Sequence, residues 1–282
     1  MQAHTLAIQN FRIAEHLLEL YQLLENLHEE DCEDELKLVV CRNLQLADNI
    51  KLQKARNEKL LILTQATIPL PKMLLDKDGP NFLLRQVVIV ACTALESFFW
   101  DALRENVLTI VRARKRGADE SLRNIKLTLD DYLSLEGYKD PDIRLQQIIL
   151  KNYERGTLYD LVAIENIANV LTVKDYWKKM ADDLGMEGKD IRRNLDELIN
   201  RRNQISHRAD RPDEQAQPPE TTDAHGLRQI TFAWVNYKVN VAKSVINASA
   251  NRFEEALKVL ENQLQQEQEQ RLARDTLPPK EP

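Results

Sequence analysis

The chain has 282 residues, of which 43% are hydrophobic and 30% charged, and its formal net charge is −6. That length allows one large domain or two small ones, and the composition suits a soluble globular protein rather than a fibrous or disordered one. The acidic balance argues against a surface that is basic everywhere, so a nucleic-acid site has to be a local patch.

The cysteines, the N-terminal sequence and the length of the apolar runs predict the cellular compartment of the protein. Cys32, Cys41 and Cys92 lack CxxC spacing, and the chain has only five histidines. We therefore expect free thiols, no zinc or other metal site and no cofactor. The N-terminus does not show a charged region followed by an apolar one, and the strongest apolar run, residues 87–92, is far too short to span a bilayer. These features predict a cytoplasmic protein without a membrane segment.

Glycine and proline are scarce and clustered, and the long stretches between them show helical spacing. This pattern predicts an all-α fold, a helical bundle with long central helices and a long C-terminal helix. We expect the first two helices over about residues 3–29 and 34–67, with an acidic break at 29–31. The first helix carries an apolar stripe formed by Leu6, Phe11, Ile13, Leu17, Leu20, Leu24 and Leu27.

A helix over about residues 82–115 follows, and its first half is apolar on nearly every side. Such a helix is normally the buried centre of a bundle. Several short helices are expected over 117–186, with turns at Gly137, Pro141 and Gly156.

The next helix begins near Lys189 and ends before Pro212, because the residue ahead of a proline resists helix. The polar residues 210–226 are expected to form a mobile loop. The last helix starts near Leu227, and its packing stripe ends at Leu264. We accordingly divide the chain into an N-terminal helical extension, a helical bundle and a disordered tail, over residues 1–78, 79–275 and 276–282.

The segment Arg202-Asn203-Gln204-Ile205-Ser206-His207, near the end of a predicted helix, is the most informative part of the chain. Arginine is a permanent cation that binds phosphate through two-point contacts, and histidine ionises near neutral pH. A phosphate-binding cation beside a proton carrier, without metal ligands nearby, suggests metal-free cleavage of a phosphodiester.

Helical geometry places Arg202 near the middle of the core stripe of its helix, with His207 about 140° round from it. A lone buried charge is costly, so Arg202 needs a partner. Glu96 is surrounded by apolar residues on the most apolar helix, and we expect it to meet Arg202 or His207. A Glu–Arg pair that only fixes the helix register is the alternative.

Two segments resemble a known family. The Arg-Asn-x-x-x-His string and its setting, residues 195–208, resemble the RxxxxH signature of the HEPN superfamily of small helical ribonucleases. The segment from Val87 to Leu103, with Ala94-Leu95-Glu96-Ser97-Phe98-Phe99, resembles an earlier helix of the RiboL-PSP-HEPN branch, in which an acidic residue stands where Glu96 is. The resemblance covers roughly residues 80–260. It implies a metal-independent endoribonuclease, usually a homodimer with two motifs facing one cleft and often a toxin or phage-defence effector, in some cases acting on tRNA.

On this interpretation a ribose 2′-hydroxyl attacks the adjacent phosphorus. His207 is the general base, and His207 of the partner subunit is the general acid. Arg202 stabilises the charge on the phosphoryl oxygens, and Asn203 binds the phosphate or orients the imidazole. Basic residues near the motif and on a second patch are assigned to RNA binding: Arg193, Arg201, Arg208, Arg114 and Arg116. For the second patch, a solvated helix end is the alternative.

Two other interpretations stay open. The chain can be a non-catalytic HEPN-like helical module that binds RNA or a protein partner in the same groove. Residues 1–78 can also dock an antitoxin or sensor protein, which the apolar stripe over 6–27 permits, although such stripes are more often ordinary core.

Overall fold

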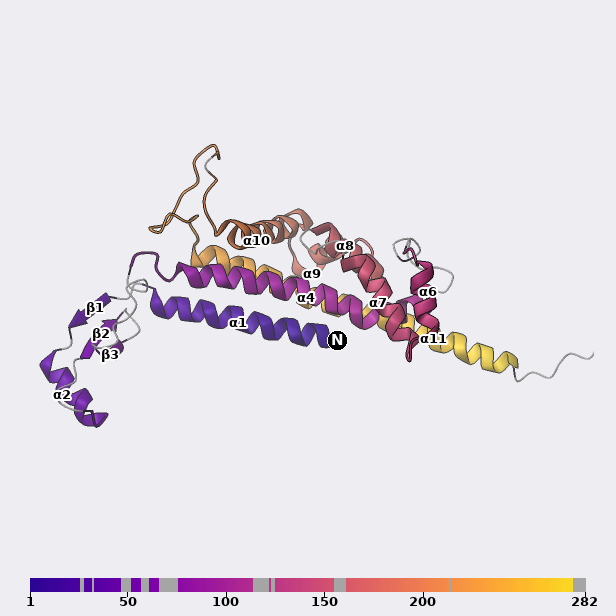
Figure 1. Cartoon of the computed structure of the whole chain (residues 1–282), viewed down its shortest axis with the longest axis horizontal. Helices are drawn as coiled ribbons and strands as arrows, with labels where there is room; N and C mark the ends of the chain where they lie inside the picture. Colours follow the sequence, from indigo (N-terminus) through magenta and orange to yellow (C-terminus); the bar gives the residue numbers. More distant parts are fainter. Residues whose placement is uncertain are drawn as a thin grey trace, which may run out of the picture. The chain divides into compact units, whose positions relative to one another are not determined.

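The computed structural model describes residues 1–25, 28–31, 33–46, 52–56, 61–65, 76–113, 122, 125–154, 161–213 and 215–275. The chain divides into two compact units, of which the first is 1–11, 91–200 and 240–282 and the second is 12–90 and 201–239. The described helices and strands (Figure 1) are α1 (Gln2–Leu24), β1 (His28–Asp31), α2 (Asp34–Asn43), β2 (Leu52–Arg56), β3 (Leu61–Gln65), α4 (Asn81–Ala113), α6 (Leu129–Glu136), α7 (Pro141–Glu154), α8 (Leu161–Val170), α9 (Tyr176–Leu184), α10 (Gly188–Arg208) and α11 (Phe232–Asp275).

The core of the first unit is an aromatic cluster shared by α4, α9 and α11. Phe98 stacks on Phe253 with ring centroids 6.0 Å apart, and Phe99 meets Tyr176 edge to face at 6.1 Å. All four rings are fully buried. The Tyr176 hydroxyl is hydrogen-bonded to Ser249 Oγ at 2.7 Å, so the polar end of the ring is also satisfied.

The long helix α4 is apolar on nearly every side, as predicted. By length and composition it is the one described helix that could cross a membrane, but 61% of that apolar window is buried inside the protein. The central helix of a bundle has the same composition, because it is packed on all sides. The prediction of a buried central helix is therefore confirmed.

Local signals explain the short helices between α4 and α10. At the start of α6, Thr128 Oγ1 accepts a hydrogen bond from the Asp131 N–H at 3.1 Å, and the Thr128 N–H donates back to Asp131 Oδ2 at 3.0 Å. This capping box lowers the pKa of Asp131, because its carboxylate accepts from Thr128. Gly137 ends α6, and α7 begins at Pro141, where a proline is tolerated in the first turn. The turns predicted at Gly137 and Pro141 are confirmed, and the turn predicted at Gly156 lies outside the described residues.

The apolar stripe predicted on α1 is wrong as a description of its core face. The large residues Leu6, Ile13 and Leu20 are 41%, 51% and 41% exposed. The buried face consists instead of Ala3, Ala7, Phe11, Ala14, Leu18 and Tyr21. Alanine lets neighbouring helices approach closely, and a search for large apolar residues overlooks it.

The second unit contains a three-stranded antiparallel sheet in the order β1-β2-β3. Strands β2 and β3 lie where a helix over 34–67 was expected, and β1 overlaps the predicted acidic break at 29–31. His28 pairs with Arg56 and Asp31 with Gln53, and Leu52 and Arg56 of β2 pair with β3 residues. That expected helix is wrong, because among its described residues only those of α2 are helical and those of β2 and β3 form strands. The segment has neither glycine nor proline and is rich in helix-forming residues, so local propensity favours a helix. Strand pairing instead depends on partners that are distant in the sequence, and local propensity does not include them. The all-α prediction is confirmed for the helical body, and this sheet is an addition to it.

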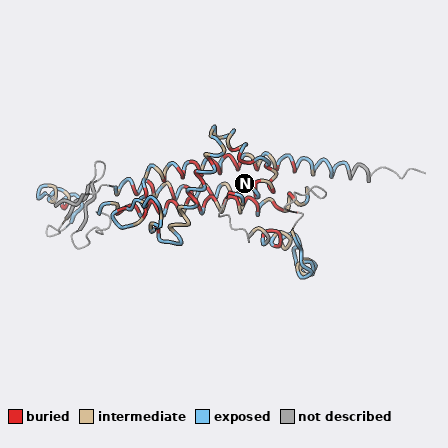
Figure 2. Tube along the Cα trace, turned by 90° about the horizontal axis from the view of Figure 1, so that it is seen from above, coloured by how far each residue is buried: buried red, intermediate tan, exposed pale blue. Residues whose placement is uncertain are grey.

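The long C-terminal helix is also confirmed, although α11 begins at Phe232 rather than near Leu227. Its buried side ends at Leu260, Leu264 is half-buried, and residues 265–270 are exposed, as the pale blue stretch of Figure 2 shows. The loss of the packing stripe beyond Leu264 is therefore confirmed. The tail predicted over 276–282 lies outside the described residues.

Candidate active site

The predicted motif lies on the last two turns of α10, whose earlier turns are fixed in the core of the first unit. Ile191, Leu195 and Leu198 are fully buried, and the Cys92 thiol of α4 lies 3.6 Å from the Leu198 carbonyl oxygen. At the other end a Cβ on Gly188 would lie 3.1 Å from the Trp177 carbonyl oxygen, so this close approach favours glycine.

The helix ends abruptly after the motif. Ala209 and Asp210 both have a left-handed backbone, with φ of 50° and 59°. Two consecutive non-glycine residues in that region are strained, and the surrounding contacts must hold them there. The Asp210 N–H donates to the Gln204 carbonyl oxygen at 3.1 Å, which closes the helix end. The prediction that this helix ends before Pro212 is confirmed.

The motif residues differ in exposure. Arg202 and Asn203 are half-buried, and His207 is exposed. The Nη2 atom of Arg202 and the Oδ1 atom of Asn203 are shielded from solvent, and Oδ1 has no hydrogen-bond partner among the described residues. Asn203 and His207 are four positions apart and so lie on the same side of α10. The imidazole is therefore accessible to a ligand, while the arginine beside it is partly enclosed.

A buried ion cluster, which we call the Arg85 cluster, holds the end of α10. It consists of Arg85, Arg201, Asp210 and Asp223. Arg85 Nε donates to Asp210 Oδ2 at 2.6 Å, and Arg85 Nη2 donates to Asp223 Oδ2 at 2.7 Å. Arg201 Nη2 donates to the same Asp210 oxygen at 3.0 Å. Asp210 is 0% exposed, and Arg85 and Asp223 are 7% and 8% exposed.

The Arg85 cluster joins the start of α4, the end of α10 and the two ends of the loop over 209–231. Arg85 and Arg201 each donate to the Arg228 carbonyl oxygen, at 3.0 and 2.9 Å. Arg228 is itself buried and pairs with Glu220 at 2.9 Å. Within the loop predicted over 210–226, Asp210 and Asp223 are both held by Arg85, and the mobility expected of this loop stays a prediction.

Burial and hydrogen bonding shift the pKa values of the groups in this cluster in opposite directions. Burial raises the pKa of Asp223, but hydrogen bonds from Arg85 and from the backbone N–H groups of Leu227 and His225 outweigh it, so this pKa is lowered. Burial lowers the pKa of Arg201, and the Asp210 carboxylate opposes that effect without cancelling it. Arginine nonetheless remains charged in proteins, so the cluster is held by ionic contacts.

Sequence reasoning missed Arg85, Asp210 and Asp223. A signal for Arg85 was available, because it is a charged residue within the apolar run from Leu83 to Val88. The same argument had selected Glu96. Nothing in the sequence indicates that the loop supplies the two carboxylates, because both partners are remote from Arg85 along the chain.

Glu96 lies on the α4 segment of the first unit and is half-buried, with its Oε1 atom shielded from solvent. Arg202 and His207 belong to the second unit. The expected meeting of Glu96 with Arg202 or His207 stays a prediction.

The arginines assigned to RNA binding have different surroundings. Arg201 is part of the Arg85 cluster, and its side chain is 15% exposed. Arg193 is exposed and pairs with Asp190 at 2.9 Å, and Arg208 is exposed and lies 3.9 Å from Asp213. Arg114 and Arg116 lie outside the described residues. Acidic neighbours thus offset much of the basic charge predicted around the motif.

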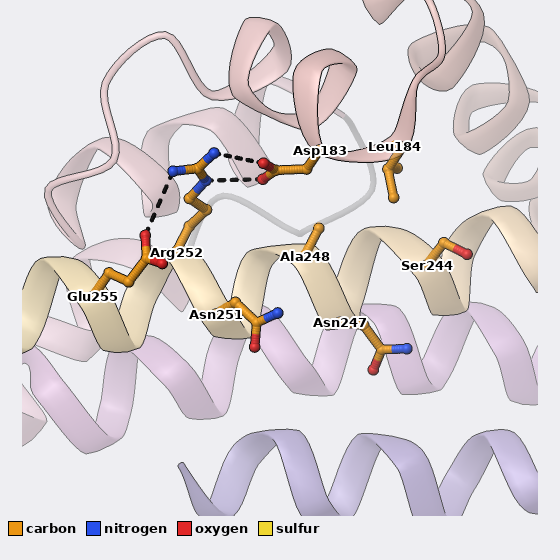
Figure 3. Close-up of a pocket in the computed structure, with 8 residues that line it drawn as sticks. All are labelled: Asp183, Leu184, Ser244, Asn247, Ala248, Asn251, Arg252 and Glu255. Atoms are coloured by element: carbon orange, nitrogen blue, oxygen red, sulfur yellow. Dashed lines mark hydrogen bonds and ion pairs between the residues drawn. The ribbon is translucent and has the colours of Figure 1, made fainter.

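The described residues also include a pocket on the first unit, of about 450 Å³, at the end of α9 and along α11. Figure 3 shows that Arg252 spans it from α11 to Asp183, with Nε 2.8 Å from Asp183 Oδ2. None of the predicted site residues lines this pocket. Among the described residues, no three His, Cys, Asp or Glu side chains gather closely enough to hold a metal ion.

The family model for the RiboL-PSP-HEPN domain matches residues 50–255. The chain belongs to this family. Comparison of this RiboL-PSP-HEPN protein with curated proteins and with solved structures found no match in either set. The match contains both Glu96 and the RxxxxH motif. It begins at residue 50, so it also contains β2 and β3, and it leaves α1 outside. The domain boundaries proposed from the sequence stay a prediction.

Proposed function

We propose that this RiboL-PSP-HEPN protein is a metal-independent endoribonuclease with His207 and Arg202 at its active site. The main support for this proposal is the position of the RxxxxH motif at the end of α10. His207 is exposed at the last turn of α10, and the half-buried Arg202 lies about 7.5 Å earlier along the helix axis. An accessible proton carrier beside a partly enclosed cation suits binding of a phosphodiester and proton transfer to or from it.

The proposed reaction needs only the RNA and two imidazoles. His207 takes the proton from a ribose 2′-hydroxyl, and the 2′-oxygen attacks the neighbouring phosphorus. The bond to the 5′-oxygen breaks, and His207 of the partner subunit donates a proton to that oxygen. The products are a 2′,3′-cyclic phosphate and a 5′-hydroxyl. Arg202 stabilises the negative charge that develops on the phosphoryl oxygens, where its planar guanidinium can make two contacts.

Asn203 supports the site through its position relative to His207. It lies one turn before His207 on the same side of α10, and its Oδ1 atom is buried without a hydrogen-bond partner among the described residues. A buried acceptor of this kind is normally satisfied in some state of the protein. We propose that the Asn203 amide binds the substrate phosphate or orients the imidazole when RNA is bound. Glu96 is proposed to orient Arg202 or His207.

The proposed biological role is that of a cytoplasmic toxin or phage-defence effector acting as a homodimer, with tRNA among its candidate substrates and an antitoxin or sensor as a candidate partner. Arg193 and Arg208, whose side chains are exposed, are proposed to contact the RNA backbone, whereas Arg201 is held in the Arg85 cluster. Their acidic neighbours predict a modest electrostatic contribution, so RNA affinity should weaken with salt less steeply than for a protein with an unopposed basic patch.

The proposal is tested by incubating the purified full chain with end-labelled RNA, including tRNA, in the presence of EDTA. Wild type is expected to produce fragments with 2′,3′-cyclic phosphate and 5′-hydroxyl ends. Arg202→Ala should be slower by roughly 10²–10³-fold, because it removes a group that stabilises charge in the transition state. Arg202→Lys should recover only part of the rate, since lysine lacks the bidentate geometry. Fragments bearing 5′-phosphates, or loss of cleavage in EDTA, would contradict the mechanism. RNA binding without cleavage would identify the non-catalytic module instead.

A further inference from the structure

The outward side of α1 carries a second apolar row, which we call the outer seam. It consists of Leu6, Asn10, Ile13, Leu17, Leu20 and Leu24. Leu6, Ile13 and Leu20 are 41%, 51% and 41% exposed, and the other three are half-buried. The intervals between successive members are four, three, four, three and four residues. That alternation is the heptad spacing of a coiled coil.

The outer seam is separate from the face that α1 buries against its own chain. At 100° per residue the seam is centred about 100° away from the buried residues Ala3, Phe11 and Leu18. A helix that only covers a core has one apolar stripe. Two stripes on α1, one of them exposed, indicate that this helix packs against something further.

The charges around the outer seam indicate which partner fits. Its flank on the solvent side is formed by Gln9 and His16, and the charged Arg12, Glu15 and Glu19 lie more than about 100° from its centre. The seam and this flank therefore carry no formal charge, although 30% of the chain is charged. When two copies meet at this seam, no like charges are brought together. A partner that binds through charged side chains would have no opposite charge to pair with here.

Asn10 is the one polar member of the seam, and it indicates how two copies align. In a parallel pair with Asn10 at an a position, Leu6, Ile13 and Leu20 occupy d positions. Each Asn10 then faces the same residue of the other copy, and the two amides can hydrogen-bond. A single asparagine at such a position fixes register and partner number at some loss of stability.

We propose that α1 pairs through its outer seam with α1 of a second copy of this chain, in parallel and in register at Asn10. The seam spans about 27 Å, which is short for an isolated coiled coil. Here α1 is already folded against its own core, so pairing does not also have to form the helix. The pairing of α1 does not require ribonuclease activity and uses residues other than those of the proposed catalytic cleft, although the proposed reaction also needs a second copy of the chain.

The test is the mass of the full chain by sedimentation equilibrium, compared with the double variant Ile13→Glu/Leu20→Glu. We expect the variant to halve the mass, with the association constant reduced more than about a hundredfold, because two apolar contacts per helix become facing carboxylates. The matched control is Leu129→Glu/Leu133→Glu, which changes two leucines that are 75% and 55% exposed on α6 and should leave the mass unchanged. A monomeric wild type, or a variant with the mass of wild type, would overturn the proposal.

Cross-linking tests the register and does not depend on how the glutamate variant folds. In the paired state Asn10→Cys should form a disulfide between chains under mild oxidation, since the two thiols face each other. Gln22→Cys lies on the opposite side of α1 and should give no more linked dimer than wild type, whose own cysteines set the background. Linked dimer from Gln22→Cys but not from Asn10→Cys would refute the proposed seam.

Discussion

Removal of Arg85 should destabilise this protein far more than removal of an exposed ion pair. Arg85 is 7% exposed and makes hydrogen bonds of 2.6 and 2.7 Å to Asp210 and Asp223, both of which are also buried. In Arg85→Met the aliphatic part of the side chain is largely kept, and the guanidinium is lost. Asp210 then retains only Arg201 at 3.0 Å, and Asp223 retains only backbone donors as described partners.

The expected loss in the free energy of unfolding arises because two buried carboxylates lose the guanidinium that neutralises them. Breaking a buried ion pair by removing one partner lowers the free energy of unfolding by about 3–5 kcal/mol. Arg112→Met is the matched control, because Arg112 pairs with Asp142 on the surface, where the two side chains are 59% and 52% exposed. That loss should be about 1 kcal/mol or less. Both are measured by urea unfolding at pH 7, followed by circular dichroism at 222 nm.

A second variant separates the charge effect from a general packing loss. Arg85→Met/Asp223→Asn removes one of the stranded carboxylates and should recover at least about 1 kcal/mol of the loss. The reasoning is refuted if Arg85→Met is no less stable than Arg112→Met. It is also refuted if the added Asp223→Asn change lowers the stability of Arg85→Met further.

Three further predictions concern pH and packing. The pKa of Asp223 is lowered in the folded state, so its contribution is complete above the ordinary carboxyl pKa of about 4 and is lost as pH falls through the lowered value. The difference in urea midpoint between wild type and Asp223→Asn should therefore shrink below pH 4. Burial, with help from the Glu25 carboxylate, raises the pKa of Tyr21 to about 12, so the stability that this group contributes is complete below about pH 10 and is lost as pH rises through 12. Unfolding midpoints from pH 9 to 12 should fall more steeply for wild type than for Tyr21→Phe. Phe253→Ala should lower the free energy of unfolding by about 3–5 kcal/mol, because this fully buried ring stacks on Phe98, and an unfolding curve like that of wild type would contradict the core assignment.

The sequence was sufficient where structure depends on local signals. The span of α4 follows from a stretch without glycine or proline between Pro80 and Gly117, and the end of α10 follows from Pro212. Both are set by residues within a few turns of the element itself. The RxxxxH motif was also recognisable from the spacing of Arg202 and His207, and Glu96 was recognisable as a carboxylate within an apolar helix.

The remaining features depend on contacts between distant segments. The strands β1, β2 and β3 are stabilised by their pairing, and their residues locally favour helix as much as strand. The buried face of α1 is marked mainly by alanines, so a stripe of large residues pointed to the wrong side. The Arg85 cluster needs side chains more than a hundred positions apart, and a single sequence gives no way to pair them.

The central claim is that His207 transfers a proton during RNA cleavage, and the most direct measurement is the single-turnover cleavage rate of His207→Ala against His225→Ala. His225 is also an exposed histidine of the second unit, but it lies outside the motif, so it controls for loss of an imidazole alone. We predict that His207→Ala is slower than wild type by roughly 10²–10⁴-fold and that His225→Ala stays within about twofold. Equal rates for wild type and His207→Ala would contradict the claim.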